Sequence, residues 1–126
     1  MKNKNFLIAA GGIFGFLGVA IGAFGSHGLR DILTPDKMEI FKTGVFYQLI
    51  HSIAILAIGF FGEWKYYNAA LLFSAGIVLF SFSIYSYAIS GIGAITFIIP
   101  AGGICFLIGW LLIIINAIKP KKFADS

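Results

Sequence analysis

The segment Phe6–Gly25, FLIAAGGIFGFLGVAIGAFG, decides the fold class of this chain. A helix rises about 1.5 Å per residue, so about 20 apolar residues cover a hydrocarbon core about 30 Å thick. Glycines recur here in alternating steps of four and three, and on a helix they form one stripe. They are Gly11, Gly15, Gly18, Gly22 and Gly25. Because glycine costs about 1 kcal/mol relative to alanine inside a helix, the stripe predicts a neighbouring helix at very close range.

The composition is that of a protein surrounded by lipid. Hydrophobic residues make up 60% of the 126 residues, charged residues 11%, and the mean hydropathy is +0.97. A soluble domain of this size buries only about two-thirds of its unfolded surface and could not hide so much apolar area. The net charge of +4 comes from basic residues that flank apolar runs, which argues against nucleic-acid binding. The lipid bilayer is therefore the expected partner.

Four membrane-spanning helices account for the apolar segments. We therefore expect an all-α membrane protein in which residues 1–126 form one compact four-helix bundle. The predicted spans are about 6–25, 44–61, 68–89 and 94–118. Thr34 is a suitable N-cap for a lead-in helix that begins near Pro35 and continues into the second span. Pro100 either kinks the fourth helix or marks its first turn, and the apolar residues before it favour the kink.

Lysine and arginine counts orient the bundle, because short cytoplasmic loops carry an excess of both. Six lie on one predicted side: Lys2, Lys4, Lys65, Lys119, Lys121 and Lys122. Three lie on the other side, all in the first loop: Arg30, Lys37 and Lys42. Both termini are therefore predicted to be cytoplasmic, and Tyr85 and Tyr87 are expected at the outer membrane interface.

The glycine stripe needs a partner, and the fourth span offers one. This span would run antiparallel to the first, and it has small residues at four-residue spacing, Ala101, Cys105 and Gly109. We predict that the two stripes meet. The competing hypothesis is that the same glycines mediate self-association or contact another membrane protein.

His51 is the one ionisable residue well inside a predicted span, with Tyr47 and Gln48 one turn before it. Such a residue is a functional candidate, because an unpaired polar group is costly in hydrocarbon. The structural alternative is that a neutral His51, Gln48 and Tyr47 hydrogen-bond to neighbouring helices and fix their register. The acidic residues all lie outside the spans: Asp31, Asp36, Glu39, Glu63 and Asp125. Proton-coupled export, which generally needs a carboxylate inside the membrane, is disfavoured.

His27 lies at the outer end of the first span between glycine-containing turns. It either closes the helix end or acts as a pH-sensitive or ligand-facing group, because histidine normally titrates near neutral pH. Two histidines and one cysteine are too few and too dispersed for a convincing metal site. We find no catalytic residues, no cofactor motif and no nucleophile with a base beside it.

Several short motifs together resemble one family, domain of unknown function 423, a group of small four-span bacterial membrane proteins. They are Ile21–Leu29 (IGAFGSHGL), Tyr47–His51 (YQLIH), Gly93–Thr96 (GAIT), Pro100–Gly103 (PAGG) and Phe106–Trp110 (FLIGW). Residues 97–99 separate Thr96 from Pro100, which commonly follows the threonine directly in the family. The resemblance implies four helices in the bacterial inner or plasma membrane, and it implies no established enzymatic activity, substrate or cofactor.

The preferred interpretation is a non-enzymatic accessory or interaction protein of the bacterial plasma membrane. This interpretation rests on the stripes of small residues that suit helix packing and on the lack of charged residues inside the predicted spans. The alternative is a small ion or solute transporter or channel that uses the polar cluster around His51, with His27 at its outer mouth. An intramembrane enzyme or lipid-binding module ranks last, because no nucleophile, base and oxyanion donor occur together.

Overall fold

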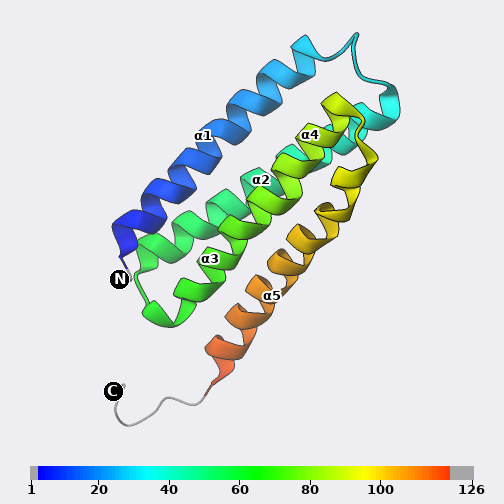
Figure 1. Cartoon of the computed structure of the whole chain (residues 1–126). Coiled ribbons are helices and arrows are strands. Elements are labelled where there is room, and N and C mark those ends of the chain that lie inside the picture. Colours follow the sequence, from blue (N-terminus) through cyan, green and yellow to red (C-terminus); the bar gives the residue numbers. More distant parts are fainter. Residues whose placement is uncertain (1–2, 120–126) are drawn as a thin grey trace.

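The computed structural model describes residues 3–119, which form four long helical stretches that alternate in direction (Figure 1). The first two stretches are α1 (Lys4–Gly28) and α2 (Pro35–Phe61). The third is η1 (Trp64–Tyr66), α3 (Tyr67–Gly76), η2 (Ile77–Phe82) and α4 (Ser83–Ser90), and the fourth is η3 (Gly93–Phe97) and α5 (Ile99–Ile118). Each stretch is long and apolar enough to cross a membrane, which confirms the predicted four-span helical class. The predicted topology signals Lys2, Lys121 and Lys122, and Asp125, lie outside the described residues.

The second helix begins where its sequence predicts. The Thr34 side chain accepts a hydrogen bond from the Lys37 backbone N–H at 3.3 Å, and Pro35 occupies the first turn. These are the normal N-cap and N1 preferences of a helix. The lead-in and the second span form one continuous helix, as expected. It ends at Gly62, whose φ of 78° lies in the left-handed region that glycine adopts without a steric penalty.

The fourth stretch differs from the predicted kinked helix over 94–118. A short 3₁₀ segment, η3, comes first, and the α-helix begins at Ile99 with Pro100 in its first turn. Proline is well suited to this position, because the N–H that it lacks would have no partner inside the helix. Pro100 therefore starts α5 and does not bend it.

The glycine stripe of α1 packs against α2 and not against the fourth span, so the predicted pairing is wrong. A Cβ atom at Gly11, Gly18 or Gly22 would lie within 3.0 Å of side-chain atoms of Leu56, Leu49 and Val45, respectively, and one at Gly25 would overlap the Phe41 ring. Gly15 has more room, with the Ser52 Cβ at 3.8 Å. The reason is complementarity between neighbours: α2 presents large side chains in helical register, and they fill the surface that the glycines leave bare.

The small residues of α5 serve a different neighbour. A Cβ at Gly109 would lie 2.5 Å from the Phe73 ring, and one at Gly102 would overlap the backbone of Phe80. Ala101, which was predicted to share this contact, is exposed. The buried stripe of α5 is therefore Gly102, Phe106 and Gly109, and it packs on α3 and η2.

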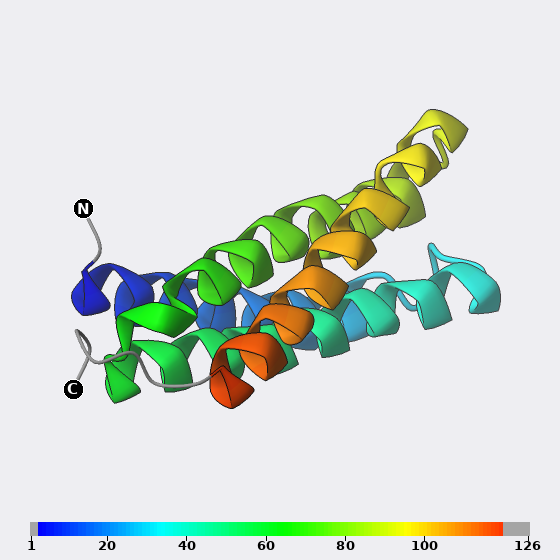
Figure 2. The same ribbon diagram turned by 90° about the horizontal axis from the view of Figure 1, so that it is seen from below.

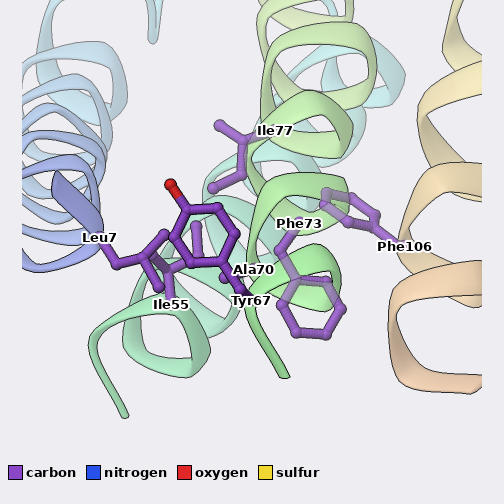
Figure 3. Close-up of a cluster of buried hydrophobic side chains, with 7 residues drawn as sticks. All are labelled: Leu7, Ile55, Tyr67, Ala70, Phe73, Ile77 and Phe106. Carbon is purple, nitrogen blue, oxygen red and sulfur yellow. The ribbon is translucent and has the colours of Figure 1, made fainter. Parts of the chain in front are cut away.

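The closest approach of α5 falls on the irregular part of the third stretch. Residues Ile77–Phe82 form a π-helical segment, whose turns are wider than those of an α-helix. Figure 2 shows α5 inclined to α2. Figure 3 shows one buried cluster joining the elements: Leu7, Ile55, Tyr67, Ala70, Phe73, Ile77 and Phe106. Phe73 and Phe106 fill the space between α3 and α5.

Candidate functional site

Gln48 links three helices through its side-chain amide. Its Nε2 donates to the backbone carbonyl of Phe14 in α1 at 2.8 Å, and its Oε1 accepts from the Tyr85 hydroxyl in α4 at 2.6 Å. Gln48 is completely buried. Both ends of the amide are therefore used inside the bundle, which fixes α1, α2 and α4 relative to one another.

The neighbouring hydroxyl groups are also bonded within the protein. Ser81 in η2 donates across to the backbone carbonyl of Gly44 at 2.7 Å, and Ser52 donates to the Gln48 carbonyl at 2.6 Å. The other serines of the third stretch that show a hydrogen bond return it to their own helix, as at Ser86. Tyr85, which was expected at the outer interface, is instead buried in this network. The sequence does hold a signal for this position: the side-chain oxygen of a buried Gln48 needs a hydrogen-bond donor, and the Tyr85 hydroxyl supplies it from another helix.

His51 lies on another side of α2 and has a defined tautomer. Its Nδ1 is 2.7 Å from the Tyr47 carbonyl oxygen, and its Nε2 is 3.0 Å from the Trp110 Nε1. A carbonyl only accepts and an indole N–H only donates, so Nδ1 carries the proton and Nε2 accepts. A second proton on Nε2 would face the indole N–H and remove that bond. The geometry therefore holds His51 as a neutral imidazole.

The imidazole ring is also enclosed by aromatic rings of other elements. It stacks on Phe106 of α5, with 3.7 Å between ring centroids and 12° between planes. Phe73 of α3 and Trp110 of α5 meet it edge-on at 5.1 and 5.7 Å. Only 4% of the His51 residue surface is exposed. Phe106 and Trp110 were not singled out as partners from sequence, although their one-turn spacing places them on one face of a helix.

A groove opens beside this aromatic cluster, between α2 and α5. It has a volume of about 420 Å³ and is lined by Tyr47, His51, Phe80, Pro100, Gly103, Ile104, Phe106, Leu107 and Trp110. We call this space the aromatic groove. Its lining comes from α2, η2 and α5, which belong to three of the four stretches long and apolar enough to cross a membrane. It is the place where the predicted candidates Tyr47 and His51 come together.

The candidate polar residues thus divide into two groups. Gln48 points toward α1 and α4, whereas Tyr47 and His51 line the aromatic groove. His27 is exposed in the last turn of α1, level with the end of the bundle, and the structure does not bring it to His51. Among the described residues, no three metal-binding side chains gather at one place.

The comparisons with known proteins agree on one family. The family described as "Protein of unknown function (DUF423)" matches residues 21–103. The chain is similar to the UPF0382 inner membrane protein YgdD of Escherichia coli K12, with 37% identity over 124 residues and 94% of each chain covered. A UPF0382 membrane protein of Haemophilus influenzae is 40% identical, covering 97% of this chain and 99% of its own. YwdK of Bacillus subtilis, also a UPF0382 membrane protein, is 36% identical over 92% of this chain and 98% of its own. No solved structure gives a significant match.

Proposed function

Because this chain belongs to the DUF423 family of bacterial membrane proteins, whose description assigns no activity, we propose its function from the geometry. It is a multi-pass protein of the bacterial inner or plasma membrane. We propose that it is a single-domain, non-enzymatic accessory protein that acts by binding another component of the membrane. The aromatic groove, where Tyr47, His51 and Trp110 meet, carries this proposal.

The polar residues inside the spans support a binding role over transport. Among the described residues, every buried polar side-chain atom has a hydrogen-bond partner in the protein. Gln48 and Ser81 hold helices together, and His51 accepts from Trp110, so these groups are not arranged as a path for water or ions. A transport pathway needs polar groups that can exchange partners with the substrate.

The glycine stripe supports placing the binding surface elsewhere. Self-association or partner binding through this stripe would require it to be free, and α2 side chains already cover Gly11, Gly18, Gly22 and Gly25. The aromatic groove on the other side of α2 has no such cover. We therefore infer that the glycines build the bundle and that the groove faces the partner.

The test is a flux assay with the purified full-length chain in liposomes. We expect no saturable flux over a panel of ions and small solutes, and no difference between wild type and His51→Ala. Protein-free liposomes provide the baseline. Saturable flux that His51→Ala abolishes, with normal folding and abundance of the variant, would overturn the accessory role in favour of a transporter.

We also propose that both termini are cytoplasmic. Lys4, Lys65 and Lys119 belong to segments at one end of the bundle, where α1 begins, α2 turns into α3 and α5 ends (Figure 1). The opposite end has basic residues only together with acidic ones, such as Lys37 with Asp36 and Glu39. A carboxy-terminal fusion to green fluorescent protein should fluoresce, and the same fusion to alkaline phosphatase should be inactive. The reverse result would invert the orientation.

A further inference from the structure

The Tyr47 hydroxyl has an unusual position in the aromatic groove. Tyr47 is in the first half of α2, is 39% exposed, and its side chain lines the groove. Its hydroxyl makes no hydrogen bond to any other residue within 3–119. Tyr85, by contrast, donates to Gln48. Since hydrocarbon holds no water to bond the free hydroxyl, the groove presents one unused hydrogen-bond donor.

The N–H groups of the other two polar side chains in the groove already donate hydrogen bonds within the protein. The Trp110 N–H donates to His51, and the His51 Nδ1–H donates to the Tyr47 carbonyl. The groove therefore offers a single donor, the Tyr47 hydroxyl, to whatever occupies it. A matching occupant carries a hydrogen-bond acceptor at the same depth.

That requirement disfavours a bare hydrocarbon chain as the specific occupant, because an acyl chain carries no hydrogen-bond acceptor. The lining favours a flat molecule, because five of its side chains are aromatic or imidazole rings: Tyr47, His51, Phe80, Phe106 and Trp110. The volume of about 420 Å³ is that of a small-molecule site.

A partner helix suits the groove less well. Helices dock closely in membranes through small residues. Here the wall on α5 has only one glycine, Gly103, and is flanked by the large exposed side chains of Ile104 and Leu107. These side chains would hold a helix away from the Tyr47 hydroxyl, whereas a planar ring can lie between them.

A second cavity lies closer to the α2–α3 turn and is lined by residues of α2, η1 and α5. It has a volume of about 280 Å³ and is lined by Ala57, Ile58, Phe61, Tyr66 and Ile113. Ile58 follows Tyr47 by eleven positions, about 16 Å along a helix. This cavity is almost entirely apolar, which suits a hydrocarbon tail.

We propose that the aromatic groove binds a lipophilic quinone-type molecule, with the Tyr47 hydroxyl donating to a ring carbonyl and the tail lying toward Ile58 and Ile113. This inference rests on the proposed binding role and names the class of ligand. It involves binding alone and no electron transfer.

The test follows the fluorescence of Trp110 in the purified full-length chain, with Trp64→Phe introduced so that one indole remains. The probe is decylubiquinone, titrated into nanodiscs prepared without quinone. We expect saturable quenching. Tyr47→Phe should raise the Kd about tenfold, equivalent to about 1.4 kcal/mol. Ile104→Trp, which narrows the rim at an exposed position, should reduce binding further. The matched control is Tyr87→Phe, which removes a hydroxyl outside the groove and should leave the Kd unchanged.

Three results would overturn this inference. One is quenching that rises linearly without saturation and equally in Tyr47→Phe, because that describes partitioning into lipid. Another is an unchanged Kd in both Tyr47→Phe and Ile104→Trp, with both variants eluting as the wild type does. The third is cross-linking from position 107 to a second copy or a partner helix that seals the groove. None of them alters the flux result, so the proposed accessory role is tested separately.

Discussion

The two sides of α2 differ in how they meet their neighbours. Toward α1, the side chains of Phe41, Val45 and Leu49 pack directly on glycines of α1, where that helix has no side chains. Toward α5, the aromatic groove separates the helices, and the link is made by His51 reaching Phe106 and Trp110. The side of α2 that faces α1 is therefore closely packed, whereas the side that faces α5 is open and is crossed only by individual side chains. We call them the closed side and the open side.

This difference separates residues that hold the bundle from residues that are available for binding. A closed contact between helices tolerates little added volume, because packed interiors have few voids. A groove tolerates it readily. The two sides of α2 should therefore respond in opposite ways to added volume. Two of the four substitutions below test this response and two test the hydrogen bonds that link the helices, from the largest expected effect to the smallest.

Gly18→Leu should break the closed side. The Leu49 side chain lies 2.7 Å from the position of a Cβ at Gly18, and the buried Gln48 lies 3.4 Å away, so a leucine cannot fit without separating α1 from α2. We expect a loss of about 3 kcal/mol in the free energy of unfolding, measured by denaturation in mixed micelles. Gly12→Leu is the control, since nothing lies within 4 Å of its Cβ position. Equal losses in the two variants would contradict the closed contact.

Gln48→Met should loosen the polar link between α1, α2 and α4 while nearly preserving volume. It leaves the Phe14 carbonyl and the Tyr85 hydroxyl without their partner. We expect a loss of about 1–2 kcal/mol. Tyr85→Phe should cost less alone, and the two losses should not add in a double-mutant cycle, because they remove one shared hydrogen bond. Strict additivity would show that the bond contributes nothing.

Trp110→Phe should remove the hydrogen bond from Trp110 to His51, which bridges the open side within residues 3–119. The loss of stability should be about 0.6–1 kcal/mol, because hydrogen bonds between membrane helices are individually weak. The more specific readout is the tautomer of His51. In the wild type, ¹⁵N NMR should show the proton on Nδ1. A wild-type spectrum with the proton on Nε2 would be incompatible with the Trp110 bond.

Leu107→Trp should have the smallest effect on stability. Leu107 is 70% exposed at the rim of the groove, so its replacement adds volume where lipid lies. We expect the free energy of unfolding to stay within about 0.5 kcal/mol of the wild type. A loss comparable to that of Gly18→Leu would mean that the open side is packed as tightly as the closed one.

The positions of the helices could be predicted from the sequence better than the contacts between them. Phe6–Gly25 has the length and composition of a span, and Thr34 with Pro35 marks a helix start by local chemistry alone. The partner of the glycine stripe could not be found in this way. A stripe shows which face of a helix is bare, whereas the choice between α2 and α5 depends on which helix presents large side chains in matching register.

The candidate site could be predicted only in part, for the same reason. His51, Gln48 and Tyr47 could be identified because polar residues are rare in such spans. Their division onto two sides of α2 depends on donors and acceptors in distant parts of the chain. Trp110 is 59 residues from His51 in sequence, and no local pattern connects them. The start of α5 at Pro100 was open to two interpretations because proline both interrupts and begins helices.

The amide of Gln48 has a consequence for how the chain is assembled during synthesis. Its donor is satisfied by the Phe14 carbonyl, within the first half of the polypeptide, and only the loop 29–34 separates the two helices involved. Its acceptor waits for Tyr85, which the ribosome makes later. We therefore expect that the first hairpin can form its contacts before the second is made, with the side-chain oxygen of Gln48 still unbonded, and that the bond to Tyr85 then fixes the position of the second hairpin.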